Sequence, residues 1–147
     1  MNYQLLFFFL FIAIGILLII KLARIYTLSV AEFKSLFNGM NDSRLIDVMA
    51  QGPNKARFKY KMYPIDSIQC YDKKGNYVTL KNSPAVEVQF VQNNNKRTSV
   101  YFDSIRIQGN IITGSQSRYI NSMRTIDLDT VSKIELRNIK KGLRYVG

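Results

Sequence analysis

The sequence predicts a mainly β domain, an antiparallel small barrel or sandwich, that follows one N-terminal transmembrane helix. Three observations carry this prediction: an uncharged apolar run at the start of the chain, a strict alternation of cationic and apolar residues at 57–62, and a series of short β-type segments separated by turn residues. A chain of 147 residues has room for one domain plus an anchor. We expect a transmembrane anchor at residues 1–26, a juxtamembrane helix and linker at 27–42, and a basic β domain at 43–147.

The N-terminal run is long enough to cross a membrane. Residues 1–20 carry no charged side chain, and a helix of about 20 residues spans a hydrocarbon layer of roughly 30 Å. A helix is required because the backbone must satisfy its own polar groups in lipid. Lys21 ends the run and can extend its ammonium group to the headgroups. The residues expected to form the anchor are Leu5, Phe8, Phe11, Ile16, Ile20 and Lys21.

A cleaved signal peptide is the competing interpretation of this run. Ser29–Ala31 has the small-x-small form of a cleavage site. Signal peptides, however, place positive charge before the apolar core, whereas here Lys21 and Arg24 follow it and residues 1–4 carry no charge. The flanks therefore favour an uncleaved anchor. By the positive-inside rule the same cations place the domain in the cytoplasm.

Apolar side chains recur at helical spacing after the anchor. The spacing predicts a helix that continues from the anchor and ends at Asn38–Gly39, which can form a C-terminal cap. Its apolar face could lie on the membrane interface or pack on the domain, and the sequence supports both alternatives equally. The residues that share this face are Tyr26, Val30, Phe33 and Phe37.

Strand patterns dominate the rest of the chain. Residues 44–50 fit a short helix as well as a strand. Arg57–Met62 alternates cations with large apolar side chains, which is typical of a half-buried strand with a cationic outer face. Short turns such as Gly109–Asn110 separate the later segments, which predicts a meander that closes into a barrel or a sandwich. Further strands are expected at 67–71, 77–80, 85–91, 98–102, 105–108, 111–113, 125–128 and 133–137.

At three places in the sequence an aspartate is followed by a serine or threonine close to the start of an expected strand. The physical interpretation is a turn in which one of these side chains bonds to its own backbone. The sharper alternative is an acidic metal site built from the three aspartates, but scattered aspartates usually serve turns or face solvent. The pairs are Asp66–Ser67, Asp103–Ser104 and Asp129–Thr130.

The composition argues against common kinds of catalysis. The chain has no histidine and one cysteine, Cys70, so the usual general base and the ligand sets of zinc sites are missing. Ser117 lacks a base in any recognisable motif. The loop at 114–119 could hold an anion on its backbone amides, although such segments are usually plain polar loops. We therefore expect a protein that is not an enzyme and has no catalytic, cofactor-binding or metal-ligating residues.

The chain is strongly basic. Lysine and arginine total 21 against 10 acidic residues, a formal charge of +11. Such a charge attracts anionic lipid surfaces, acidic proteins or nucleic acid, or else maintains a solvated surface, and it does not choose among these. Membrane attachment makes nucleic acid the least expected of the three partners. The residues expected to contact an anionic surface are Arg57, Lys59, Lys61, Lys140, Lys141 and Arg144.

Several short phrases between Leu80 and Val146 carry a resemblance to a known group: LKNSPAVEVQF, VYFDSIRIQGN, ITGSQSRYI, TIDLDTVSKIEL and LRYV. With these phrases the chain resembles small uncharacterised envelope proteins of Bacteroidetes-type bacteria. The stretch from Ile105 through TIDLDTVSKIEL also looks like the strands of Sm-like or pleckstrin-homology-like small barrels. The first resemblance implies export and gives no catalytic residue, so the side of the membrane stays open between export and the cytoplasm.

These observations together predict a membrane-anchored, non-enzymatic interaction or structural module. Its basic face would turn toward anionic lipid headgroups or toward an acidic protein partner. The alternative is a small β-barrel domain that binds a small ligand or nucleic acid. The two differ in where the cations lie: on one face at the anchor side for a membrane-apposed module, or around a concave, aromatic-lined groove for a ligand. An even scatter of the cations would favour a plain solvated surface over both.

Overall fold

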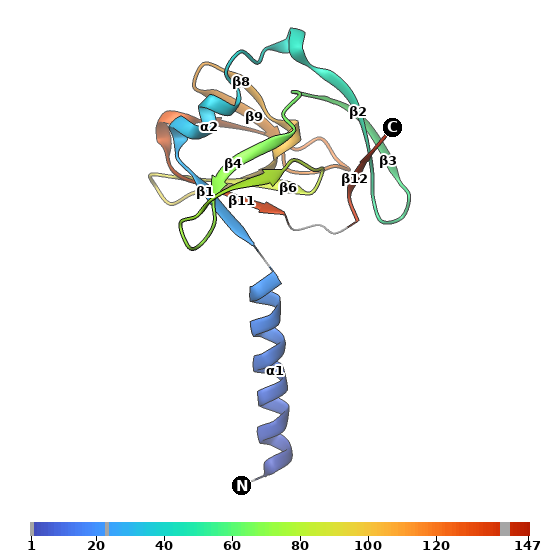
Figure 1. Cartoon of the computed structure of the whole chain (residues 1–147), viewed down its shortest axis with the longest axis vertical. Coiled ribbons are helices and arrows are strands. Elements are labelled where there is room, and N and C mark those ends of the chain that lie inside the picture. Colours follow the sequence, from blue (N-terminus) through green and yellow to red (C-terminus); the bar gives the residue numbers. More distant parts are fainter. Residues whose placement is uncertain (1, 23, 139–141) are drawn as a thin grey trace.

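The computed structural model describes residues 2–22, 24–138 and 142–147, with side chains in the same ranges except 15–22. One helix, α1 (Tyr3–Leu22), projects from a domain made mainly of antiparallel strands (Figure 1). The predicted mainly β fold is thus confirmed.

The strands form one six-stranded sheet in the order β5-β4-β1-β11-β6-β7 and two three-stranded sheets, β10-β9-β8 and β12-β2-β3. Every described pairing is antiparallel. These open strand orders do not support the predicted barrel among the described residues. The strands are β1 (Ile25–Leu28), β2 (Ile46–Gln51), β3 (Arg57–Met62), β4 (Ser67–Tyr71), β5 (Tyr77–Lys81), β6 (Val86–Gln92), β7 (Arg97–Tyr101), β8 (Arg106–Gln108), β9 (Ile111–Ser115), β10 (Met123–Asp127), β11 (Val131–Asn138) and β12 (Arg144–Val146).

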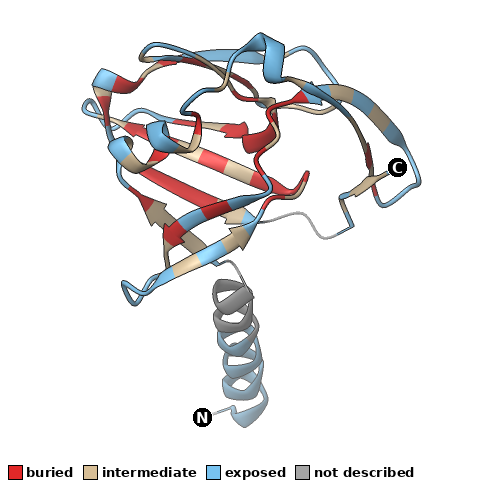
Figure 2. Ribbon diagram, turned by 45° about the horizontal axis from the view of Figure 1, so that its top comes forward, coloured by how far each residue is buried: buried red, intermediate tan, exposed pale blue. Residues whose placement is uncertain are grey.

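The main core lies between the six-stranded sheet and a cover formed by α2 (Val30–Leu36) and the β10-β9-β8 sheet. The sheet contributes fully buried side chains such as Phe90 and Leu136, and the cover contributes Phe33 and Ile112. The rings of Phe33 and Phe90 meet edge to face with centroids 5.4 Å apart. In Figure 2 the buried residues follow these strands.

The predicted continuous helix at 26–39 was wrong. Residues 25–28 form β1, which lies inside the six-stranded sheet between β4 and β11. The helix begins only at Val30, where Ser29 and Glu32 form a reciprocal capping box. It ends at Phe37, and Gly39 follows at φ 76°. The capping signal at Ser29 marks a helix start that the 3.6-residue spacing alone does not reveal.

The aromatic face of this helix packs on the domain. Phe33 and Phe37 are buried in the main core, and Val30 packs against it. Phe37 contacts the rings of Tyr63 and Phe102. Of the two alternatives for this face, packing on the domain is therefore the one observed.

The ambiguous segment at 44–50 is mostly a strand. A short 3-10 turn, η1 (Asp42–Arg44), leads into β2, and Asn41 caps the turn by accepting a hydrogen bond from the Ser43 amide. β2 pairs with β3 along its whole length, so that Ile46 faces Met62 and Gln51 faces Arg57. The strand predicted at Arg57–Met62 is confirmed.

Two of the three expected Asp-hydroxyl turns have the same geometry. They are the 3-10 turns η2 (Phe102–Ser104) and η3 (Leu128–Thr130). In each, the hydroxyl donates to the backbone oxygen three residues earlier: Ser104 to Tyr101 and Thr130 to Asp127, both at 2.7 Å. The turn interpretation is confirmed at these two places.

The helix α1 presents apolar side chains to its surroundings. Leu5, Phe8 and Phe11 are 57%, 63% and 73% exposed, and the side chains of Ile16, Ile20 and Lys21 lie outside the described residues. Within the part of the chain whose side chains are described, no helix is both long and apolar enough to cross a membrane. The transmembrane role of this helix stays a prediction.

A close backbone approach between β7 and β9 makes Gly114 a sensitive position. A Cβ atom on Gly114 would lie 2.8 Å from Cγ2 of Val100, which is buried in the core. We predict that Gly114→Ala lowers the free energy of unfolding by about 1–3 kcal/mol, measured by denaturant titration of the full chain in detergent.

Gly52→Ala is the matched control. The nearest atom to its added Cβ is Leu143 Cδ2 at 3.7 Å, an ordinary contact distance. If Gly52→Ala and Gly114→Ala were equally destabilising, the close approach to Val100 would not be the cause.

Candidate functional site

The strand register places the described cations of the basic surface on one face. Across the β12-β2-β3 sheet, Arg144 lies opposite Gln51, which lies opposite Arg57. Because directly paired residues point to the same side of a sheet and side chains alternate along each strand, every second residue of β3 joins them. The four described cations of this cationic face are Arg57, Lys59, Lys61 and Arg144, all exposed.

One of these cations has a partner. Lys61 Nζ lies 3.0 Å from Oδ1 of Asp47, directly across the β2–β3 pair, and both side chains are largely exposed. Such a surface ion pair contributes little stability, but it offsets one positive charge of the face. A hollow of about 380 Å³ adjoins this face and is lined in part by Lys59, Met49 and Val146.

The described cationic face contains four of the six cations predicted from the sequence, and it does not lie beside α1. Lys140 and Lys141 fall outside the described residues. The β12-β2-β3 sheet forms one flank of the domain, whereas α1 leaves from its underside (Figures 1 and 2). The four described cations share one face, and of these four only Lys59 lines the adjoining hollow, together with Tyr60.

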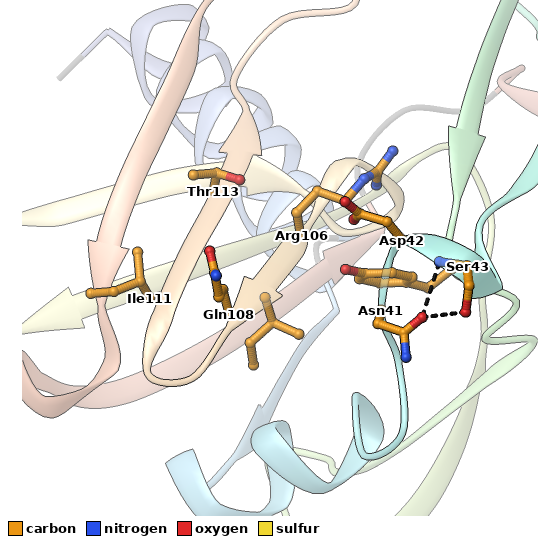
Figure 3. A pocket seen from close by; sticks show the side chains of 9 residues that line it. Asn41, Asp42, Ser43, Arg106, Gln108, Ile111 and Thr113 are labelled. Atoms are coloured by element: carbon orange, nitrogen blue, oxygen red, sulfur yellow. Dashed lines mark hydrogen bonds between the residues drawn. The ribbon is translucent and has the colours of Figure 1, made fainter.

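A second hollow lies between the loop at 41–43 and strands β8 and β9 (Figure 3). Its volume is about 620 Å³, which is within the range of small-molecule sites. Two of its polar side chains bond to each other, and Arg106 bonds to backbone oxygens outside the lining. Asn41 Oδ1 accepts hydrogen bonds from the amide and the hydroxyl of Ser43. Arg106 donates to the backbone oxygens of Lys61, at 2.6 Å, and Ile105, at 3.1 Å.

The hydroxyl groups at this hollow belong to Ser43, Tyr63 and Thr113, and Asp42 adds a carboxyl group. The chain has no histidine to act as a general base beside them. The guanidinium of Arg106 lies over the Tyr63 ring at 5.4 Å and is held by backbone carbonyls. These contacts fix the Arg106 side chain at the wall of the hollow.

The strongest electrostatic feature is a buried cluster around Asp103. Its side chain is fully buried and accepts hydrogen bonds from the hydroxyls of Tyr60 and Tyr145, the latter at 2.9 Å. Arg118 donates to the same carboxylate at 2.7 Å and to the backbone oxygen of Pro84 at 2.7 Å. The Arg118 guanidinium also lies over two aromatic rings, those of Tyr101 at 4.0 Å and Tyr60 at 5.0 Å.

Burial and charge shift the pKa values in this cluster. Burial, together with the negative charge of Asp103, raises the pKa of Tyr60 and of Tyr145 well above the usual tyrosine range. Burial works to lower the pKa of Arg118, but the Asp103 carboxylate more than offsets it and the pKa is raised. The cluster is thus an ion pair with two neutral phenols.

The cluster joins elements that the main core does not join. Asp103 lies in η2, Arg118 in the loop between β9 and β10, Tyr60 in β3 and Tyr145 in β12. The main cluster of buried core residues includes no residue of β2, β3 or β12. The polar cluster therefore helps to hold the β12-β2-β3 sheet against the rest of the domain, together with the hydrogen bond from Arg106 to the Lys61 oxygen and the ring contact of Phe58 with Tyr119.

This cluster is not predicted from the sequence. The loop at 114–119 is expected to be a polar loop or an anion site, yet Arg118 in that loop is 7% exposed and already paired with Asp103. Asp103 is expected in a turn or, as the sharper alternative, in a metal site. No local signal links these residues, because Tyr60 and Asp103 are 43 positions apart and Tyr145 and Asp103 are 42 apart.

Two further candidates for chemistry have ordinary structural roles. Cys70 is buried in the main core, and burial raises its thiol pKa, which makes it a poor nucleophile. In the part of the chain that the structure describes, no three acidic or thiol side chains come together in a way that could hold a metal ion. The alternative metal site at Asp66, Asp103 and Asp129 is not assembled there.

Comparison with protein-family models, with curated proteins and with solved structures finds no match to this chain. The resemblance to small envelope proteins therefore stays a prediction, and the function must be argued from the chain's own surfaces.

The buried ion pair gives a test of stability. Asp103→Asn keeps the shape but removes the charge that compensates Arg118, so we predict a loss of about 3–5 kcal/mol in the free energy of unfolding. Asp129→Asn is the matched control, because Asp129 has the equivalent place in η3 and is exposed. It should change stability by less than about 0.5 kcal/mol. Similar losses in both variants, measured by denaturant titration, would contradict the role of the cluster.

The buried phenols give a test of pH dependence. Their folded-state pKa values exceed the unfolded value of about 10. The unfolded chain therefore releases these protons first, so the stabilisation is complete below about pH 10 and is lost as the pH rises further. We predict that the unfolding free energy begins to fall at about pH 10 and keeps falling at higher pH.

The loss of unfolding free energy with rising pH should be shallower in the double variant Tyr60→Phe/Tyr145→Phe. Tyr77→Phe, at a tyrosine that is 62% exposed, should leave it unchanged. An equally steep decline in all three proteins would assign the alkaline sensitivity to other groups.

Proposed function

We propose that this chain is a membrane-attached interaction module without catalytic activity. The helix α1 lies in the membrane, and the β domain presents the cationic face of the β12-β2-β3 sheet to an anionic partner. The observation that carries the proposal is that an apolar helix ends at Leu22 and an interior strand of the folded domain begins at Ile25.

The surface of α1 supports membrane attachment. Large apolar side chains from Tyr3 to Ile14 are exposed around the described part of the helix. A helix that is apolar on all sides is stable only when it is buried in protein or in lipid. No part of the β domain covers these side chains, so lipid is the environment that fits them.

The position of β1 supports an uncleaved helix. A cut at Ser29–Ala31 would remove β1, which pairs with β11 from Ile25 to Leu28 and also with β4. It would remove Leu28 from the core and take the capping residue Ser29 from α2. The domain therefore needs the segment that directly follows the anchor.

The cationic face supports an anionic partner. Arg57, Lys59 and Arg144 are exposed on one side of a sheet, and the register keeps their side chains on that side. Each cation near an anionic surface contributes about 1 kcal/mol, and the effect falls off within a Debye length of roughly 10 Å. Salt-sensitive attraction to acidic groups follows from this arrangement.

Membrane attachment is tested by alkaline carbonate extraction of membranes that contain the full chain. The intact chain should remain with the membrane at its full mass. Phe8→Arg/Phe11→Arg should release it, because each arginine near the centre of a membrane helix costs about 2.5–3.5 kcal/mol. Ile120→Arg, at an exposed apolar residue of the β domain, is the control and should change nothing. Release of the unaltered chain, or a shortened product, would contradict the proposal.

The same proposal predicts a defined role for the cationic face. Binding of the detergent-solubilised full chain to polyglutamate at low salt should weaken at least about tenfold in Arg57→Glu/Lys59→Glu. The control Lys81→Glu/Lys96→Glu changes the net charge equally at exposed positions of the six-stranded sheet and its β6–β7 turn. Equal weakening in both variants would show that net charge alone governs the interaction.

A further inference from the structure

The structure also indicates which end of the domain faces the membrane, given the proposed attachment through α1. The helix ends at Leu22 and β1 begins at Ile25. Three residues of chain reach at most about 11 Å, so the first residue of β1 must stay close to the end of the helix. The strand ends that neighbour Ile25 are therefore the parts of the domain nearest to the bilayer surface.

The register identifies these strand ends. β1 is antiparallel to β4, and Thr27 lies opposite Tyr71, the last residue of β4. Tyr71 in turn lies opposite Tyr77, the first residue of β5. The β4–β5 turn at 72–76 therefore points back toward α1, and it lies beside the start of β1 on the underside of the domain (Figures 1 and 2).

This turn is a rigid platform for two cations. Asp72 Oδ1 accepts hydrogen bonds from the backbone amides of Lys74 and Asn76, both at 2.9 Å, and the Asp72 amide donates to the Asn76 oxygen at 3.0 Å. Gly75 has φ 82°, which the turn requires and which glycine adopts without strain. Lys73 and Lys74 are exposed at the tip.

An aromatic pair lies at the base of the same hairpin. The rings of Tyr71 and Tyr77 have centroids 5.2 Å apart, and Tyr77 is 62% exposed. Tyrosine is enriched at the boundary between membrane and water because its ring is apolar and its hydroxyl is polar. Exposed lysines in the turn next to such a ring can reach anionic headgroups. Arg24, exposed between the helix and β1, adds a cation at the same level.

We propose that the β4–β5 hairpin is a second membrane contact, in which Lys73 and Lys74 bind anionic phospholipid headgroups and Tyr77 lies in the interfacial layer. Helix α1 and the hairpin together fix the orientation of the domain. The cationic face on the flanking β12-β2-β3 sheet is then directed along the membrane rather than into it. Its anionic partner is accordingly an acidic protein, and the headgroups belong to the hairpin.

The chain has no tryptophan, so a single introduced indole can report on its surroundings. Tyr77→Trp places the probe on the hairpin. Ile111→Trp is the matched probe, because Ile111 is also partly exposed on a β-hairpin but lies on β9, on the side of the domain away from α1 (Figure 1). Each full-length variant is reconstituted into vesicles of phosphatidylcholine with phosphatidylserine that contain a lipid with a nitroxide-labelled headgroup.

The indole at position 77 should be blue-shifted and quenched by the nitroxide at least about twofold more strongly than the indole at position 111. Lys73→Glu/Lys74→Glu in the Tyr77→Trp chain should remove most of this quenching, and raised salt should have the same effect. Arg57→Glu/Lys59→Glu in the same chain is the matched control and should leave the quenching unchanged. Vesicles of phosphatidylcholine alone should give weak quenching at both probes.

Flotation of the vesicles distinguishes a failure of the membrane attachment from a failure of the hairpin contact. A chain that does not float with the vesicles overturns the membrane attachment and the hairpin contact together. A chain that floats but shows equal quenching at positions 77 and 111 overturns the hairpin contact alone. A loss of quenching in Arg57→Glu/Lys59→Glu as large as that in Lys73→Glu/Lys74→Glu would assign headgroup binding to the cationic face and overturn the assignment made here.

Discussion

A buried ion pair is a central attachment of the β12-β2-β3 sheet to the rest of the domain. This sheet adds no residue to the main core, and Tyr60 and Tyr145 join it to Asp103, whose charge Arg118 compensates. The hydrogen bond from Arg106 to the Lys61 oxygen and the ring contact of Phe58 with Tyr119 add to this attachment. Breaking a buried pair costs about 3–5 kcal/mol, a large part of the 5–15 kcal/mol by which proteins are usually stable. The direction of the cationic face on the outer side of this sheet therefore depends in part on this ion pair.

A second constraint joins the helix to the domain. β1 is a short strand, but it lies inside the six-stranded sheet and pairs on both edges. Because β1 follows α1 so closely, the helix cannot move independently over a large distance. This differs from a domain on a long flexible linker, whose orientation would be set by diffusion. In this chain the register of β1 with β4 and β11 determines which loops lie next to the helix.

The sequence predicted the strands well because their signal is local. At Arg57–Met62 each side chain alternates between cation and apolar group, and this pattern needs no knowledge of the partner strand. The helix predicted at 26–39 failed because Tyr26 has helical spacing to Val30 by coincidence, while its backbone is fixed by pairing with β11. The cluster around Asp103 could not be predicted, because it is assembled from four separate elements whose residues share no motif.

Net charge alone does not separate the two kinds of anionic partner, whereas the strand register shows where the exposed cations lie. A formal charge of +11 attracts lipid and acidic protein alike. In the folded chain the exposed cations fall into groups with different neighbours: Lys73 and Lys74 occur with an exposed tyrosine beside the start of β1, whereas Arg57 and Lys59 occur on a flank beside a hollow. Screening limits each group to about 10 Å. On the proposed attachment, a lipid surface and a protein can therefore be bound at once without competing for the same charges.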